Sequence, residues 1–527
     1  MKPIDWLLLG FCLFLFASSA TTDILLPGPH GDEVLHACLA IDLTRPPHPF
    51  GHYTLHWGNQ PFPFGVDSHT GALKAYLLWP FFALLGPSVE LQRMFTIFLG
   101  LWILIFCYLF ISENIDRGSA FFVTLLLSLD SSFLFYSKLD AGPIIEKLLW
   151  MVVCLWTSGR FVRTHRFRYL VVGSIAGIFG IYSHIAFVWF AGAYTIAALL
   201  FYRSELLRVF KKPALYLVIP SMVCFLTIFL YWLIGETNLL SKNPPGFSGA
   251  FIMFERVSTL GGIVPDVLLG KHMEVIPLLD TKVRPLTDVF LIVSTLFLLC
   301  CRGVRLDVFK FLFFVSGIIL LEMSYTPADY VIYPHRMMVF YLFLIFFGGI
   351  AVAQGVKFLK DFKGQSIGLN AASIVILLAA IVSVYGQVSF KQEADQKIRQ
   401  TGGKWFWSDQ MVMLAGQLEG DYWKEIVCLD WGFRGPLSLL TKGKIPLTEP
   451  FWGVTVTEER KWKMLSQMIQ EASPQTLFLM HPRRMWSGGF DVKDFKKAAQ
   501  MIGKELNVEH VFHEREGDLV YFAYTIK

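Results

Sequence analysis

The sequence WLLLGFCLFLFASSA (residues 6–20) is followed, after a short segment, by GDEVLH (residues 31–36). A helix needs about 17–25 mostly apolar residues to cross the ~30 Å hydrocarbon core of a bilayer, so the first stretch, extended to residue 22, predicts a membrane helix. The second stretch presents two adjacent carboxylates, Asp32 and Glu33, close to the predicted membrane surface. Acidic residues also favour the first turn of a helix, so the pair equally fits ordinary helix-start charges. The polar residues that the rest of the chain brings to the same face distinguish the two interpretations.

The composition is that of a membrane protein. The 527 residues are 54% hydrophobic and 17% charged, with a mean hydropathy of +0.52, which is too apolar for an ordinary soluble protein. The net charge of +5 includes no basic run interleaved with aromatic residues, so the sequence does not indicate nucleic acid binding. Six of the eight cysteines lie in or beside apolar runs, and only Cys38 and Cys428 leave a disulfide open as an option.

Apolar runs of spanning length predict eleven transmembrane helices. The stretch 169–202 is too long for one span, and we divide it at Tyr182-Ser183-His184. Lys2 and the first run also resemble a cleavable signal peptide, but we expect an uncleaved helix, because its removal would break the charge pattern of the loops. The predicted spans lie near residues 6–22, 91–112, 119–136, 143–159, 169–185, 186–202, 214–234, 286–301, 308–325, 336–354 and 367–387.

Positive charges alternate between the connections of these spans. Lys and Arg favour the cytoplasmic side, so the pattern places the N-terminus in the cytoplasm and the C-terminus outside it. The chain is therefore expected to be a multi-pass integral membrane protein whose C-terminal domain lies on the outer side, in a periplasm or a lumen. The connections of one side carry little beyond Lys138 and Arg336, whereas those of the other side carry Arg117, Arg160, Arg163, Arg166, Arg168, Arg203, Arg208, Lys211, Lys212, Arg302, Arg305, Lys357, Lys360 and Lys363.

The predicted architecture is an α-helical polytopic membrane domain over residues 1–388 and a soluble α/β domain over residues 389–527. Residues 23–90 and 235–285 form long external loops, and the first contains helical patterns at Glu33–Leu43 and Ala72–Leu85. In the soluble domain, apolar and polar residues alternate as in strands or recur at helical spacing. The strands are predicted at Glu425–Leu429, Thr476–Met480, Val508–His513 and Leu519–Tyr524, and the helices at 408–418, 457–472 and 492–505.

The predicted outer face collects acids and bases near the ends of several helices. Such a set suits a reaction on a substrate whose tail lies in the bilayer. A carboxylate there can act as a general base toward a hydroxyl, and cations can hold a phosphate leaving group. The residues are Asp32, Glu33, His36, Lys74, Arg93, Lys138, Asp140, His184, His335 and Arg336.

Four short motifs follow one another along the chain. They are GDEVLHA (31–37), HTGALKAYL (69–77) continuing into FALLGPS (82–88) and Arg93, YSKLD (136–140), and LDWG (429–432). Their order and sidedness resemble the bacterial GT-C glycosyltransferases of the family-39-like group, which includes protein O-mannosyltransferases and aminoarabinose-transferase-like enzymes. Ala72 replaces a proline of the family's pattern, and the third motif is shorter than its counterpart.

The resemblance implies a transferase that moves a sugar from a polyprenyl-phosphate donor to a lipid, glycan or protein acceptor, usually with inversion. The style of the motifs favours a bacterial inner membrane, with the C-terminal domain in the periplasm. Asp32 would be the general base, with Glu33 as its neighbour or as a metal or substrate contact. Asp140 would be a second acidic residue of the site. The implied phosphate-binding residues are Lys74, Arg93, Lys138 and Arg336, and the substrate contacts are His36, His184 and His335.

Structural roles are open for several of these residues. Arg93 equally fits a cation that reaches from a helix end to the membrane interface. Lys138 and Arg336 fit this role less well, because they lie on the side where the loops carry few cations. Asp140 fits a helix cap ahead of Gly142-Pro143, and His184 fits a partner within the bundle. Asp430 and Trp431 fit a strand-to-helix turn. The spacing of His48, His52 and His56 allows a divalent metal site, but the intervening prolines and glycines oppose a helix there, and no metal site is predicted.

Two other classes of function compete with catalysis. A transporter or lipid-sugar flippase would need polar groups deep inside several helices, whereas Glu113, Glu146 and Glu322 all lie near helix ends. A non-catalytic scaffold would use the C-terminal domain to bind a partner. Release of polyprenyl phosphate from a sugar donor separates the transferase from both alternatives.

Overall fold

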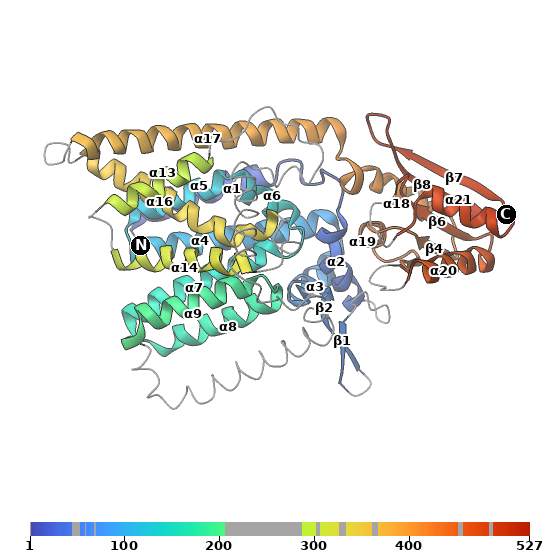
Figure 1. Cartoon of the computed structure of the whole chain (residues 1–527), viewed down its shortest axis with the longest axis horizontal. Coiled ribbons are helices and arrows are strands. Elements are labelled where there is room, and N and C mark those ends of the chain that lie inside the picture. Colours follow the sequence, from blue (N-terminus) through green and yellow to red (C-terminus); the bar gives the residue numbers. More distant parts are fainter. Residues whose placement is uncertain are drawn as a thin grey trace.

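The computed structural model describes residues 2–44, 53–57, 60–67, 70–205, 287–301, 306–325, 334–360, 367–451, 457–483 and 489–527. The chain forms a bundle of long helices with a small α/β domain at one end (Figure 1). Helix α17 (Ile367–Thr401) runs along the bundle and leads into this domain, passing residue 388 without a break. We call residues 402–527 the tail domain, and the adjoining end of the bundle the tail end.

The bundle contains helices of membrane-spanning length. Helices α1 (Pro3–Ala20), α4 (Val89–Asn114), α16 (Met338–Lys360) and most of α17 are each long and apolar enough to cross a bilayer. Ten of the eleven predicted spans coincide with described helices, and the span near 214–234 lies outside the described residues, as does the loop 235–285. The other helices are α5 (Arg117–Leu129), α6 (Ser131–Leu139), α7 (Ile144–Thr164), α8 (Phe167–Ser183), α9 (Phe187–Phe201), α13 (Thr287–Cys300) and α14 (Leu306–Tyr325).

The predicted span near 119–136 is a broken helix. Helices α5 and α6 meet at an angle of 61°. Asp130 lies at the break, where its Oδ1 accepts a hydrogen bond from Phe133 N at 2.8 Å and its Oδ2 accepts one from the hydroxyl of Tyr341 on α16. Asp130 is thus a buried acidic residue inside a predicted span, which sequence analysis did not single out among Glu113, Glu146 and Glu322.

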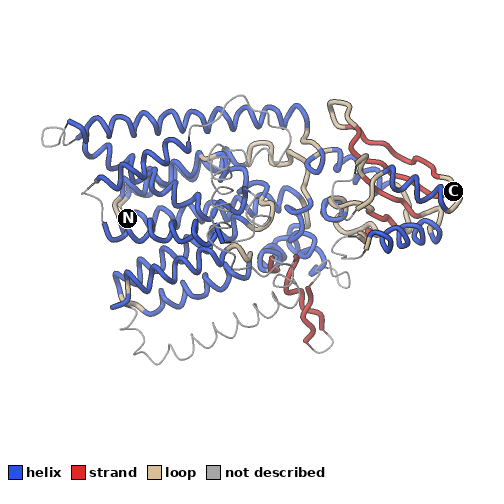
Figure 2. The backbone as a smooth tube through the Cα atoms, in the orientation of Figure 1, coloured by secondary structure: helices blue, strands red, loops and turns tan. Residues whose placement is uncertain are grey.

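The first external loop folds at the tail end. Its predicted helical patterns are confirmed by α2 (Gly31–Thr44) and α3 (Leu73–Leu85), and between them lie β1 (Tyr53–Trp57), β2 (Gln60–Asp67) and β3 (Thr70–Gly71). The β1–β2 hairpin projects from the body of the molecule (Figure 2). His56 lies in strand β1, and His48 and His52 lie outside the described residues.

The tail domain is a five-stranded sheet covered by helices on both faces. The strand order is β5-β4-β6-β8-β7, with β5, β4 and β6 parallel and β8 and β7 antiparallel to their neighbours. One apolar core lies under α18 and α19, and the other lies under α20 and α21. The four predicted strands and three predicted helices are confirmed, whereas α19 and β5 were not predicted. The elements are η4 (Trp405–Trp407), α18 (Gln410–Gly420), β4 (Glu425–Cys428), α19 (Arg434–Leu440), β5 (Leu447–Thr448), α20 (Glu458–Glu471), β6 (Thr476–Met480), α21 (Val492–Met501), β7 (Leu506–His513) and β8 (Leu519–Ile526).

The cysteine option is also decided. Cys38 lies on α2 and Cys428 at the end of β4, and both are buried free thiols. The disulfide that the sequence left open between them is not formed. The thiol of Cys38 instead donates to the backbone oxygen of Gly435 at 3.3 Å, which joins the first external loop to the tail domain.

Candidate active site

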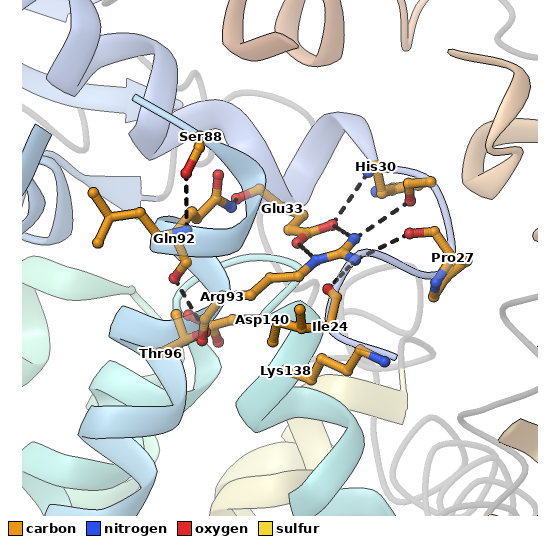
Figure 3. A network of polar contacts seen from close by, with 12 residues as sticks. Ile24, Pro27, His30, Glu33, Ser88, Gln92, Arg93, Thr96, Lys138 and Asp140 are labelled. Carbon is orange, nitrogen blue, oxygen red and sulfur yellow. Dashed lines mark hydrogen bonds and ion pairs between the residues drawn. The ribbon is translucent and has the colours of Figure 1, made fainter. Parts of the chain in front are cut away.

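Glu33 and Arg93 form a buried ion pair. Arg93 Nε lies 2.6 Å from Glu33 Oε1 and its Nη2 lies 3.0 Å from Oε2, so the two side chains meet side-on with two hydrogen bonds (Figure 3). The remaining guanidinium hydrogens reach the backbone oxygens of Ile24, Pro27 and Gly28 at 2.8, 3.0 and 3.5 Å. All five donors of Arg93 are therefore engaged within the protein.

Arg93 on α4 thus holds both α2, through Glu33, and the segment that precedes α2, through its backbone oxygens. Gln92 also donates from its side chain to the backbone oxygen of Glu33 at 2.6 Å. Lys138 on α6 donates to the backbone oxygen of Thr22 at 2.8 Å, close to where α1 ends. Through these contacts, Arg93 and Lys138 stabilise the position of the chain between α1 and α2. Direct phosphate binding by Arg93 is not supported, because its donors are all in use.

A second buried ion pair joins Lys74 to Asp140. Lys74 Nζ lies 2.7 Å from Asp140 Oδ2, and both side chains are almost completely buried. Asp140 Oδ1 accepts from Ile145 N at 2.9 Å, so the carboxylate also caps the first turn of α7. The capping interpretation of Asp140 is confirmed, and the same carboxylate holds Lys74 in place.

Asp32 and Glu33 point in different directions from α2. Successive helical residues are about 100° apart, whereas residues four apart share a face, so Asp32 lies on the face of His36. His36 Nε2 lies 3.2 Å from the backbone oxygen of Gly71, three residues before Lys74. Asp32 is partly exposed, in contrast to Glu33, which is buried. The face with Asp32 and His36 is therefore the one toward the start of α3.

The imidazole of His36 is neutral. Burial lowers its pKa well below the usual value, and the positive charge of Lys74 lowers it further. A neutral ring that donates from Nε2 to Gly71 carries an acceptor lone pair on Nδ1. That nitrogen is buried and has no hydrogen-bond partner among the residues that the structure describes. His36 thus offers an acceptor to a hydroxyl group.

Two further charged residues lie in the first turn of α7. Glu146 and Lys147 are fully buried, and Trp150 Nε1 donates to Glu146 Oε1 at 3.4 Å. The ammonium group of Lys147 makes no hydrogen bond within the described part of the chain. The charged groups that act on it electrostatically are Arg336 and Asp140. Arg336 lies in the short helix η2 (Pro334–Met337), ahead of α16.

Five buried residues thus form what we call the charge cluster, with three cations and two acids: Lys74, Lys147, Arg336, Asp140 and Glu146. Sequence reasoning placed Glu146 only at a helix end and missed Lys147. The signal was present, since the adjacent pair interrupts an apolar run just after Pro143.

His184 Nδ1 accepts from Ala186 N at 3.0 Å between α8 and α9, which supports its role within the bundle. The side chain of His335 lies outside the described residues.

Two solved proteins share this architecture over nearly the whole chain. ArnT from Cupriavidus metallidurans, bound to undecaprenyl phosphate, is 12% identical with a TM-score of 0.56, and the match covers 99% of this chain and 98% of ArnT. The Archaeoglobus fulgidus oligosaccharyltransferase tethered with an acceptor peptide is 10% identical with a TM-score of 0.52, covering 99% of this chain and 74% of that protein. No protein-family model and no curated protein sequence matches the chain. The chain shares the fold of these two proteins, an α-helical membrane domain followed by a C-terminal soluble domain.

Proposed function

We propose that this protein is a glycosyltransferase that moves a sugar from a polyprenyl-phosphate donor to an acceptor hydroxyl. The observation that carries the proposal is the charge cluster, which lies buried within a GT-C fold and close to the face of α2 that bears Asp32 and His36. A charged lipid phosphate needs cations at a place where its tail can remain in the bilayer. Lys147 in the first turn of α7 and Arg336 just ahead of α16 supply the cations. Because both lie at the ends of apolar helices, the hydrocarbon chain of the donor can stay in the bilayer.

In the proposed reaction, Asp32 takes the proton of the acceptor hydroxyl as that oxygen attacks the anomeric carbon of the sugar. The bond between this carbon and the phosphate oxygen breaks, and polyprenyl phosphate leaves with one additional negative charge. Attack from the face opposite the leaving group inverts the anomeric centre. A hydroxyl group of the sugar or of the acceptor substrate donates a hydrogen bond to His36 Nδ1, which orients that hydroxyl.

Lys147 and Arg336 are the proposed phosphate ligands. The buried ammonium group of Lys147 makes no hydrogen bond within the described part of the chain, which is costly, and the incoming phosphate supplies an acceptor. Both contacts strengthen as the leaving oxygen gains charge, which is the requirement for lowering the barrier rather than only binding the donor. Lys74 is already paired with Asp140, so its contribution is the position and field of this pair.

The proposed orientation follows the charge pattern of the loops. The N-terminus and the basic connections lie in the cytoplasm, and the tail domain lies in the periplasm of a bacterium. The donor then reaches the site from the outer leaflet.

The activity is tested with purified protein in detergent. A panel of synthetic undecaprenyl-phosphate hexoses and pentoses is supplied with outer-membrane glycolipid as acceptor, and released undecaprenyl phosphate is measured by mass spectrometry. We expect release by the wild type, at least a 100-fold lower rate for Asp32→Asn, and a normal rate for Asp42→Asn, which makes the same change further along α2. Sustained turnover by Asp32→Asn would assign the base to another residue.

One observation favours a second function, that of a lipid-sugar flippase. Discontinuous helices mark the binding sites of many transporters, and α5 and α6 form such a break at Asp130. The same assay separates the two functions, because a flippase moves the donor without releasing undecaprenyl phosphate from it.

A further inference from the structure

The tail domain packs directly on the segment that carries Asp32. Gly28 N donates to the backbone oxygen of Trp407 at 2.8 Å. Just before the tail domain, Arg399 at the end of α17 forms an ion pair with Asp23 at 2.5 Å. Gly31, the first residue of α2, lies so close to Trp431 that a Cβ there would stand 2.9 Å from the indole ring. Gly31 of the GDEVLH motif therefore touches Trp431 of the LDWG motif, although about 400 residues separate them in the chain.

His30 lies at the centre of this contact. Its ring stacks on Trp407 with centroids 4.3 Å apart and planes at 19°. Phe406 and Trp431 meet it edge-on, with centroids at 5.8 and 5.2 Å. Three aromatic side chains of the tail domain thus enclose one imidazole of the first external loop. His30 is 7% exposed.

The imidazole of His30 also caps α2. The backbone oxygen of His30 accepts from Val34 N at 3.2 Å, which is the first bond of the helix. Its Nδ1 accepts from Asp32 N at 3.1 Å, and its backbone N–H donates to Glu33 at 3.3 Å. An N-cap satisfies an amide that the helix itself leaves unpaired. Only an Nδ1 without a proton can accept this bond, so the cap requires the neutral ring.

We propose that Trp407 and Trp431 are positioning residues for the reaction. By covering His30 they keep its ring as the cap of α2, and the cap fixes the backbone of Asp32 and hence the direction of its carboxylate. The tail domain then completes the active site from outside the bundle. This inference rests on the proposed role of Asp32 as the base.

The protonation of His30 gives the inference its distinctive test. Burial lowers the pKa of His30 to about 3, whereas an exposed histidine has a pKa near 6.5. The charged and titratable groups around it are Asp32 and Glu33 on α2, Arg93 on α4, and Asp430 and His481 beside Trp431. With the aromatic cover the ring stays neutral down to about pH 3. Without the cover it takes a proton as the pH falls through about 6.5, and the cap is lost.

The experiment compares the pH dependence of undecaprenyl phosphate release between wild type and Trp407→Ala, from pH 5.5 to 8. We expect the variant, relative to the wild type, to lose about tenfold in rate between pH 7.5 and 5.5, as a group with a pKa near 6.5 requires. Trp423→Ala, elsewhere in the tail domain, should keep the wild-type profile. Asn can cap a helix but does not titrate, so Trp407→Ala with His30→Asn should lose the acid limb. A purely structural role of Trp407 predicts no such rescue.

A measurement independent of turnover accompanies the kinetics. In protein with labelled histidine rings, the His30 resonance, assigned by its loss in His30→Asn, should not shift between pH 8 and 5 in the wild type. In Trp407→Ala it should titrate near pH 6.5. Titration of His30 in the wild type, or an acid limb that persists in the double variant, would overturn the inference. Failure of the Asp32 assignment alone would leave the His30 titration as expected, so the two failures are distinguishable.

Discussion

Asp32 and Glu33 are neighbours in the chain but serve different purposes, because consecutive residues of a helix point about 100° apart. Glu33 turns toward α4 and pairs with Arg93 inside the protein, and Asp32 turns toward the start of α3. The sequence indicated the acid pair and the cations but not their partners. Hydropathy and motif order carry no information about which of Lys74, Arg93 and Lys147 is already neutralised by an acid.

The Glu33–Arg93 pair gives the first prediction. Arg93→Met leaves the Glu33 carboxylate buried without its cation, which should lower the free energy of unfolding by about 3–5 kcal/mol. Thermal unfolding of the purified protein in detergent measures the effect. Asp32→Asn is the control, since Asp32 is partly exposed, and it should unfold at the wild-type temperature while losing activity. An unchanged midpoint for Arg93→Met would show that the pair does not hold the loop.

Lys147 gives the second prediction at the scale of a residue. If its ammonium group contacts the phosphate, Lys147→Met should weaken the binding of undecaprenyl phosphate by about 10- to 100-fold, as expected for a hydrogen bond between charged groups. Native mass spectrometry of the protein with undecaprenyl phosphate alone measures this without knowledge of the sugar or acceptor. Lys391→Met removes a cation of α17 that is paired with Asp395, and it should leave binding unchanged. Equal binding by Lys147→Met and the wild type would exclude Lys147 as a phosphate ligand.

At the scale of an element, hydropathy predicted the positions of the described spans but not the break between α5 and α6. A break inside an apolar run leaves the average hydropathy unchanged. A local signal existed, because Asp130-Ser131-Ser132 has the residues that favour a helix start. Tertiary contacts then stabilise the break, since Ser131 N donates to Gln387 of α17 at 3.0 Å.

The break supplies the third prediction. Tyr341→Phe removes the hydroxyl that donates to buried Asp130, which should cost about 1.5–3 kcal/mol of stability if the carboxylate is charged. Tyr108→Phe is a matched control, because the buried Tyr108 hydroxyl has no hydrogen-bond partner among the described residues. The difference between the two midpoints of thermal unfolding in detergent is the measured quantity. Equal midpoints would show that the Asp130–Tyr341 bond contributes nothing to the broken helix.

At the scale of the whole molecule, the sequence predicted both domains but not that the tail domain packs against the first external loop of the membrane domain. Each domain has its own periodic pattern, and patterns of this kind report only on neighbours within one element. The contact depends on glycines and aromatic residues with no periodic signature, such as Gly31 against Trp431. The docked arrangement places the tail domain against α2, so loss of docking should alter activity without disturbing the bundle.

Gly28 offers a direct test of docking. A Cβ at this position would stand 2.2 Å from the backbone oxygen of Ser408, and backbone atoms cannot yield as a flexible side chain does. Gly28→Ala should therefore separate the segment before α2 from the tail domain, increase proteolytic cleavage just after α17, and slow undecaprenyl phosphate release at least tenfold. Gly416→Ala, on α18 with nothing within 4 Å of its Cβ, should change neither cleavage nor rate. Faster cleavage with an unchanged rate would mean that the tail domain docks on α2 without contributing to the reaction.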